Sequence, residues 1–241
     1  FEEPFIERKR FSLVHPQFTP DGRYLVLQCN EPSLRIFDAT NWERVDQLPG
    51  LPADAVCYRP ALTRPLAVIK TRDGAVLLWN VENEAPIAKL DESCEFKEAV
   101  FSPDESLVAV STEVDWKHKR LRVWDVESGE LVCELRPFEQ HVCEKIDDVQ
   151  WSPDGRYLLA ATKPHSFYTS EGISVWNVQS GRHRGQFTGC PSQIAGVVLL
   201  DDGTRVAAGC ADGTIRFWDF ETALTEMNRF EESLTSEPDD Q

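Results

Sequence analysis

The stretch SPDGRYLLAA, at residues 152–161, decides the fold of this chain. Its first four residues form a tight turn, because proline presets φ, aspartate bonds the neighbouring backbone and glycine tolerates positive φ. An apolar strand at residues 146–151 precedes the turn, and residues 173–176 and 184–187 have the pattern of two further strands. The stretch therefore predicts an antiparallel hairpin that extends into a four-stranded unit.

This turn recurs along the chain. Residues 19–22, 102–105 and 200–203 read TPDG, SPDE and LDDG, and each follows one short apolar strand and opens another. The second unit departs from the pattern, because it carries RPALTRP at residues 59–65.

A second motif, an apolar run that ends in an aromatic residue followed by Asp or Asn, occurs five times. Its aromatic residues are Phe37, Trp79, Trp124, Trp176 and Trp218, which are separated by 42, 45, 52 and 42 residues. Self-similarity at a nearly fixed period of this length is the signature of a repeat architecture.

Together, the Ser-Pro-Asp-Gly turns, the Trp-Asp strand ends and the period near 42 resemble the WD-repeat family over roughly residues 11–225. The resemblance implies an all-β fold, a β-propeller of four-stranded antiparallel blades with one blade for each repeat. About five WD-type repeats are recognisable, whereas most members of the family have seven. Three explanations stay open: the chain is part of a larger propeller, it carries degenerate repeats, or it forms a five-bladed ring or is completed by a partner.

We place the repeats at about residues 11–50, 51–92, 93–138, 139–189 and 190–230. Residues 221–224 have the pattern of a short helix, so the last repeat has a poor fourth strand of its own. We expect residues 1–10 to supply a strand that closes this last blade, because propellers must protect their sheet edges. Residues 231–241 carry five acids and no base, a composition that predicts a flexible acidic tail.

The five motif aromatics, Phe37, Trp79, Trp124, Trp176 and Trp218, are assigned to the packing of the blades. Asp73 and Asp212 each precede a glycine and stand six residues before a motif tryptophan. The resemblance implies that these aspartates stabilise the turn between the second and third strands. The Gly-His dipeptide of the family is missing, and we interpret His141, near its expected place in the fourth repeat, as structural.

The chain carries 41 acids against 25 bases, a net charge of -16 that disfavours binding to nucleic acid. Its seven cysteines show no CxxC spacing, and several lie in apolar runs, so we expect reduced thiols and a cytoplasmic location. No run approaches the 18 apolar residues that a membrane-spanning helix needs, and we therefore expect no membrane partner.

The third and fourth repeats exceed the spacing of 42, and both insertions, at residues 112–119 and 163–171, fall between the second and third strands. Such connections share one rim of a propeller, so neighbouring repeats would bring the two insertions together. Their aromatic and basic residues, of the kinds that dominate binding hot spots, are Trp116, Lys117, His118, Phe167 and Tyr168. We predict a partner-binding patch there. The alternative is that the loops fold back and shield the ends of the blades.

Evidence for catalysis in the sequence is weak. The adjacent acids Asp147-Asp148 and Asp201-Asp202 also suit solvated or turn positions. The sequence has no serine nucleophile elbow, no HExxH, no glycine-rich phosphate loop and no Cys–His metal spacing. Among the five histidines, His118 and His165 could approach each other only across the insertions. We therefore expect no catalytic residue, no metal and no cofactor.

The predicted function is a non-catalytic scaffold or adaptor that binds one or more proteins or peptides. Fold resemblance alone does not establish this, because propellers host unrelated activities. One alternative is a sensor or autoinhibitory domain of a longer signalling protein, and a less favoured one is a propeller-type hydrolase. Self-association or a longer parent chain would also complete the propeller.

Overall fold

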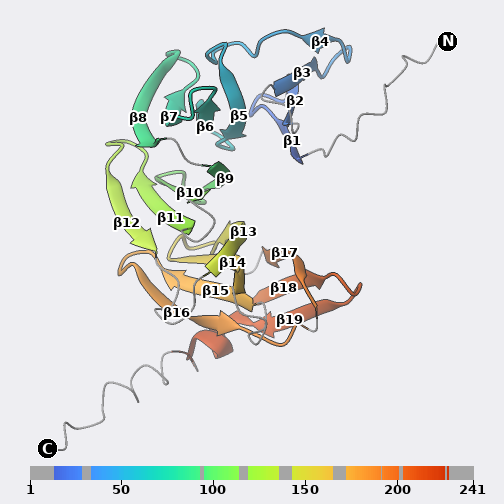
Figure 1. Cartoon of the computed structure of the whole chain (residues 1–241), viewed down its shortest axis with the longest axis vertical. Helices are drawn as coiled ribbons and strands as arrows, with labels where there is room; N and C mark the ends of the chain where they lie inside the picture. The colour runs from blue at the N-terminus through green and yellow to red at the C-terminus, as the bar shows by residue number, and fades with distance from the viewer. Residues whose placement is uncertain are drawn as a thin grey trace, which may run out of the picture. The chain divides into compact units, whose positions relative to one another are not determined.

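The computed structural model describes residues 14–28, 34–92, 95–113, 119–135, 143–164, 172–190, 192–200, 203–225 and 227. These residues form five antiparallel sheets, one in each repeat, and a helical segment at residues 220–225 (Figure 1). The fold is all-β and of the β-propeller class, as the repeats predicted. The chain divides into two compact units, residues 1–93 with the first two sheets and residues 94–241 with the other three.

The sheets are called blades 1 to 5 in chain order. Blade 1 contains β1 (Val14–Phe18), β2 (Tyr24–Gln28), β3 (Leu34–Asp38) and β4 (Arg44–Val45). Blade 2 contains β5 (Ala55–Pro60), β6 (Leu66–Thr71), β7 (Val76–Asn80) and β8 (Ala85–Asp91). Blade 3 contains β9 (Glu95–Phe101), β10 (Leu107–Glu113), β11 (Lys119–Asp125) and β12 (Leu131–Leu135). Blade 4 contains β13 (Cys143–Trp151), β14 (Tyr157–Pro164), β15 (Gly172–Asn177) and β16 (Arg182–Phe187). Blade 5 contains β17 (Ile194–Leu199), β18 (Arg205–Cys210) and β19 (Ile215–Asp219).

The Pro-Asp-Gly turns join the first and second strands through a compact set of hydrogen bonds. In blade 4 the Ser152 hydroxyl donates to Asp154 at 2.5 Å and accepts from the backbone N–H of Tyr157 at 2.9 Å. Gly155 adopts a φ of 69°, in the left-handed region that glycine enters without steric cost. Thr19 makes the same pair of hydrogen bonds in blade 1, so the hydroxyl, and not serine itself, is what the turn requires.

The Asp or Asn that follows each motif aromatic caps the next turn. The side-chain oxygen of Asp125 accepts from the backbone N–H of Ser128 at 2.8 Å, and that of Asn177 accepts from Ser180 at 2.9 Å. Short polar side chains of this kind satisfy turn backbone groups two or three residues ahead. The recurring Trp-Asp or Trp-Asn pair therefore marks the end of a third strand.

In blade 5 the same capping residue starts a helix instead of a hairpin. Asp219 accepts from the backbone N–H of Thr222 at 2.7 Å, as the N-cap of the helical segment at residues 220–225. Blade 5 accordingly has three strands within the described residues, in agreement with the poor fourth strand predicted for this repeat. Residues 1–10, predicted to close this blade, lie outside the described residues.

The core of the first unit lies between blades 1 and 2. Val26 and Ile36 of blade 1 pack in one cluster with Tyr58, Ile69 and Trp79 of blade 2. Ala67 and Ile69 of β6 both belong to the cluster, because side chains two positions apart in a β-strand lie on the same face of the sheet. The segment between the blades also contributes to the cluster, through the buried Leu48 and Leu51.

Blade 4 is buried on both faces, which explains the continuous apolar run at residues 157–161. Leu158 belongs to the cluster shared with blade 3, and its neighbour Leu159 to the cluster shared with blade 5. On the blade 3 side Leu158 pairs across the sheet with Trp151 and Trp176. Strands covered on both faces have no need for alternating polar residues.

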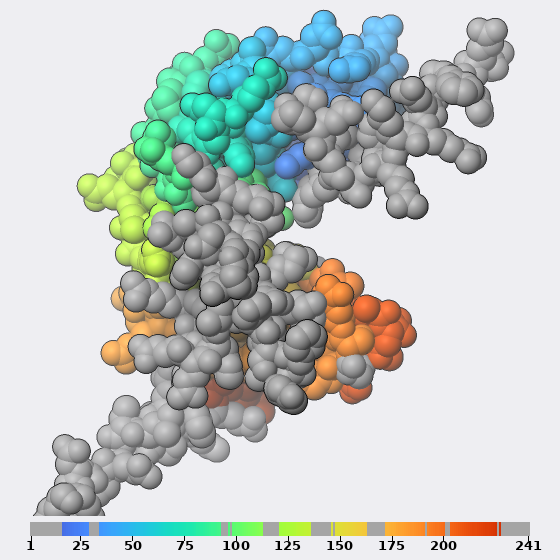
Figure 2. Space-filling view, viewed as in Figure 1, coloured from blue at the N-terminus to red at the C-terminus, as the bar shows by residue number. Residues whose placement is uncertain are grey.

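Blade 5 is less completely covered than blade 4. Ile215 and Phe217 of β19 are 63% and 59% exposed, on a strand that contributes to the orange-to-red surface in Figure 2.

Among the described residues, no helix has the length and apolar character needed to cross a bilayer.

Candidate functional site

The predicted partner patch falls outside the described residues. This applies to all five of its members, Trp116, Lys117, His118, Phe167 and Tyr168, and also to His165. The strands that border the insertions are described: β10 ends at Glu113 and β11 begins at Lys119, while β14 ends at Pro164 and β15 begins at Gly172. Both insertions thus connect second to third strands in adjacent blades, whose first strands are in contact. The patch itself stays a prediction.

A buried polar network supports the base of the blade 4 insertion. The Thr162 and Ser174 hydroxyls lie 2.9 Å apart, and the Gln186 amide donates to the Thr162 hydroxyl at 3.0 Å. The Gln186 side chain packs so closely on Gly172 that a Cβ there would lie 2.4 Å from it. The strand ends that flank this insertion are therefore held in place by specific side-chain contacts.

The motif aromatics differ in exposure. Trp176, Trp124 and Trp79 are buried at 0%, 4% and 9% exposure, whereas Phe37 and Trp218 are partly buried. The Trp79 indole N–H donates to the Gly50 carbonyl at 2.7 Å and the Trp218 indole N–H to the Thr188 carbonyl at 3.2 Å. How much each contributes to stability stays a prediction.

Asp73 and Asp212 lie in the turns between the second and third strands of blades 2 and 5. Asp73 accepts from the Thr71 hydroxyl and the backbone N–H of Ala75, and Asp212 accepts from the backbone N–H and hydroxyl of Thr214. These hydrogen bonds lower the pKa of both carboxyls, with the Thr71 hydroxyl the largest cause at Asp73 and the Thr214 N–H at Asp212. His141 lies outside the described residues.

One member of the two acid pairs has a structural role. Asp148 sits at a β-bulge with a φ of 49°, accepts from the backbone N–H of Val197 and from the Gln150 amide, and so connects blade 4 to blade 5. The Asp147 side chain, Asp201 and Asp202 are outside the described part of the chain. No group of three or more potential metal ligands occurs among the residues that the structure describes.

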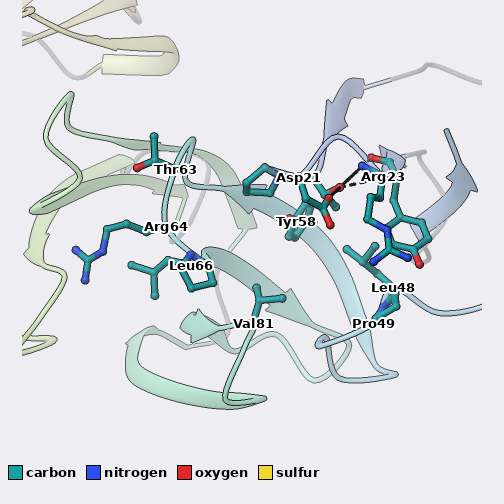
Figure 3. A pocket seen from close by; sticks show the side chains of 13 residues that line it. Asp21, Arg23, Leu48, Pro49, Tyr58, Thr63, Arg64, Leu66 and Val81 are labelled. Atoms are coloured by element: carbon teal, nitrogen blue, oxygen red, sulfur yellow. Dashed lines mark hydrogen bonds between the residues drawn. The ribbon is translucent and has the colours of Figure 1, made fainter. Parts of the chain in front are cut away.

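A cavity of about 420 Å³ opens between blades 1 and 2, and we call it the interblade pocket (Figure 3). Its inner surface includes the buried side chains of Leu48, Tyr58 and Leu66. Pro20, Pro49 and Pro65 also line it, and proline keeps the backbone of such a wall stiff. The volume lies within the range of small-ligand and side-chain pockets.

Charged residues surround the mouth of the interblade pocket. Figure 3 shows Thr63 and Arg64 on one side, and Asp21 and Arg23 on the other. Asp21 is held by the Thr19 hydroxyl and the backbone N–H of Arg23, and the Thr19 bond is the main reason that its pKa is lowered. Burial, together with the charge of Asp21, raises the pKa of Tyr58 well above its usual range. The Tyr58 hydroxyl is therefore a permanent donor at neutral pH.

This pocket was not predicted from the sequence, although the sequence contains a signal for it. The second repeat replaces the Ser-Pro-Asp-Gly turn with the stretch ALTRP at residues 61–65. In the structure this departure supplies Thr63, Arg64 and Pro65 to the pocket. A repeat that loses its standard turn is a place to look for a binding feature.

Comparison with known proteins gives matches to two family models. The model of the WD domain, G-beta repeat, matches residues 181–219. The model described as eukaryotic translation initiation factor eIF2A matches residues 52–184, more than half of the chain.

Several curated proteins are similar to the chain. A coronin-like protein of Saccharomyces cerevisiae is 28% identical over 184 residues, which cover 73% of this chain and 26% of that protein. The small ribosomal subunit protein RACK1y of Oryza sativa subsp. japonica is 27% identical over 151 residues, covering 61% of this chain and 41% of that protein. The angio-associated migratory cell protein of Homo sapiens is 30% identical over 162 residues, covering 65% and 32%. The chain thus spans about a quarter to two fifths of the length of these relatives.

Proposed function

Because this chain belongs to the WD-repeat family and, over more than half of its length, to the family of the eIF2A model, we propose that it is a non-catalytic scaffold that binds other proteins or peptides. The observation that carries the proposal is the set of five WD-type blades, in which blades 1 and 2 share one core and blade 4 shares cores with blades 3 and 5. Stacked blades hold their connecting loops on a rigid support, and binding residues are commonly found on such loops.

The first partner surface that we propose is the patch on the insertions of blades 3 and 4. Trp116, Phe167 and Tyr168 are large aromatic residues with the basic Lys117 close by in sequence, the combination found in binding hot spots. The polar network of Thr162 and Ser174 supports this assignment, because it fixes the ends of the two strands that the insertion connects.

Affinity capture from a lysate of the source organism tests the scaffold and the patch together. Wild-type chain is compared with the triple variant Trp116→Ala, Phe167→Ala, Tyr168→Ala, after both are shown to melt alike. Trp42→Ala is the matched control, since Trp42 is 60% exposed on a turn of blade 1. We expect a partner that the wild type and the control capture and the triple variant loses. A partner retained by all three would move the site elsewhere, and no partner at all would count against the scaffold.

A more specific candidate is a scaffold at the translation machinery. It is favoured by the match of residues 52–184 to the eIF2A model and by similarity to a protein named as part of the small ribosomal subunit. The net charge of -16 opposes direct contact with ribosomal RNA, so we propose that basic proteins provide the contact.

Sedimentation of the tagged chain with small ribosomal subunits in a sucrose gradient tests this candidate. We expect co-sedimentation that survives nuclease trimming of exposed RNA and weakens with added salt, because salt screens contacts between an acidic and a basic protein. A chain that stays at the top of the gradient would remove the translation role and leave the general scaffold untouched.

A further inference from the structure

We propose that the acidic tail, residues 231–241, docks within its own chain on a basic surface of blade 4 that contains Arg156 and Arg182. This inference goes beyond the proposed scaffold function and does not depend on it. The tail lies outside the described residues, whereas the surface lies within them, and both belong to the second compact unit.

The two arginines lie at one end of blade 4, and we call the surface that they form the basic edge. Tyr157, Asn177 and Arg182 are direct neighbours across β14, β15 and β16. The Arg156 guanidinium lies 5.6 Å from the centre of the Tyr157 ring. Because neighbouring strands are roughly 5 Å apart, one acidic segment can contact Arg156 and Arg182 together.

The positive charge of the basic edge is not neutralised by the described part of the chain. Arg156 and Arg182 are exposed, and neither guanidinium forms an ion pair or a hydrogen bond with a residue that the structure describes. The nearby carboxyl of Asp154 is held by the Ser152 hydroxyl and by the backbone N–H of Arg156. Residues 172–200 contain no acid, although the whole chain has 41. This region therefore favours an acidic ligand.

The last described residues bring the chain to blade 4. The helical segment at residues 220–225 begins there, because the Phe220 ring meets the Tyr157 ring edge-on at 5.8 Å. Met227 packs so closely on Gly185 of β16 that a Cβ at residue 185 would lie 2.6 Å from the Met227 side chain. Figure 1 shows the helical segment, in red, beside β16. The tail is therefore tethered close to the basic edge.

The tail is long enough to reach both arginines. Its first acids, Glu231 and Glu232, follow Met227 by four and five residues, which an extended chain spans in roughly 13–18 Å. Arg182 is three positions from Gly185 along β16, a distance of roughly 10 Å in a strand. Exposed ion pairs are individually weak, but a short tether gives the tail an effective concentration in the millimolar range. Weak contacts are then sufficient for docking.

Docking of the tail has a consequence for the outer strand of blade 4. Within the described sheet, β16 is an edge strand, and an edge strand presents backbone groups with which another chain can pair. The docked tail shields this edge and competes with acidic segments of other proteins for the same arginines.

Arginine footprinting with p-hydroxyphenylglyoxal, followed by mass spectrometry of the full chain, tests the contact. Wild type is compared with a variant whose tail acids are neutralised by Glu231→Gln, Glu232→Gln, Glu237→Gln, Asp239→Asn and Asp240→Asn. We expect Arg156 and Arg182 to react about threefold faster in the variant, which corresponds to a tail docked for about two thirds of the time in wild type. Equal rates in the two proteins would refute the contact.

Arg23 is the matched control for this experiment. It lies over Tyr24 in blade 1 as Arg156 lies over Tyr157 in blade 4, so its environment is similar while its position is remote in sequence from the tail. We expect Arg23 to react at the same rate in both proteins. A rise at Arg23 equal to that at Arg156 and Arg182 would show a general effect of charge on the reagent and would overturn the proposal.

Salt and dilution establish what protects the arginines in wild type. We expect the protection to disappear at about 1 M salt, where the screening length falls to about 3 Å, and protection that survives would contradict a contact between charges. We expect no change on dilution of the protein by about tenfold, because the tail binds its own chain. Protection that is lost on dilution would mean that a second copy supplies the tail, which would overturn docking within one chain.

Cleavage of the tail by an endoproteinase specific for glutamate gives the reciprocal measurement. Its sites in the tail are Glu231, Glu232 and Glu237. We expect cleavage to be about threefold faster in the double variant Arg156→Ala, Arg182→Ala, which releases the tail, and unchanged in Arg23→Ala, after all three proteins are shown to melt alike. The same cleavage rate in wild type, the double variant and the control would count decisively against docking.

Discussion

Trp176 shows how far a single motif aromatic contributes to stability. Its side chain is fully buried in the cluster between blades 3 and 4. We expect Trp176→Ala to lower the free energy of unfolding by about 3–5 kcal/mol, because it removes a large buried side chain and leaves a cavity. Trp218→Ala, in the same unit, should cost clearly less, since Trp218 is partly exposed. Urea denaturation followed by circular dichroism compares the two, and equal losses would contradict the argument.

His183 should make stability depend on pH. Its ring packs edge-on against Trp176 at 5.4 Å, and burial lowers its pKa from 6.5 to about 4. Between these values the unfolded chain binds a proton that the folded chain does not, so stability falls as pH drops through this window. The loss amounts to roughly 3 kcal/mol at most by pH 4.

Thermal unfolding of wild type and His183→Phe across this pH window tests the effect. The phenylalanine keeps an aromatic ring against Trp176 and cannot be protonated, so the difference in melting temperature should grow as pH falls from about 7 to about 4.5. The turn aspartates titrate below this window, since hydrogen bonds lower their pKa from 3.8. Parallel curves for the two proteins would show that His183 does not carry the pH dependence.

At the scale of the element, the hydroxyl that opens each Pro-Asp-Gly turn is the critical group. Ser152 is 2% exposed and bonds both Asp154 and the backbone N–H of Tyr157. Ser152→Ala leaves that N–H without its acceptor and should cost about 1–3 kcal/mol. Ser152→Thr should restore most of the loss, because Thr19 performs this task in blade 1. The midpoint of urea unfolding measures both, and a threonine variant as weak as alanine would count against this role.

Turns and strand ends were predictable from the sequence because their chemistry is local. Asp154 and Asp219 each bond groups within three residues, and the helix after Asp219 was expected from residues 221–224. Contacts between blades were not predictable in this way. The Trp151 indole donates to the Val100 carbonyl at 3.0 Å across 51 residues, and no local pattern specifies such a partner.

The repeat period predicted the fold class of the whole molecule, but not the interblade pocket. That pocket assembles Asp21, Leu48, Tyr58, Arg64 and Val81, which belong to separate segments of two blades. Each of these residues also suits an ordinary turn or core position, so sequence alone offered no reason to group them. The two insertions, in contrast, are recognisable from the sequence alone, because their length and aromatic content are visible without any knowledge of packing.

The cysteines of the whole molecule provide a test of its environment. We propose that the chain works in the cytoplasm with all seven cysteines reduced. Among the described residues Cys57, Cys133, Cys190 and Cys210 are not joined in disulfides, and Cys57 and Cys210 are buried. Burial, helped by a hydrogen bond with Cys210, raises the pKa of Cys190 to about 12. Little thiolate therefore forms at neutral pH even where a thiol is partly exposed.

Thiol counting should give seven free thiols in denaturant without added reductant, and much slower labelling of Cys57, Cys190 and Cys210 in the native protein. Mass spectrometry of the iodoacetamide-treated chain measures the extent of labelling at each cysteine. Slow native labelling with a full count in denaturant would mean that burial protects the thiols from oxidation, which agrees with a reducing compartment. A count below seven, with the matching loss of hydrogen mass, would reveal a disulfide. The proposed cytoplasmic location would then have to be abandoned, because such bonds persist in oxidising compartments.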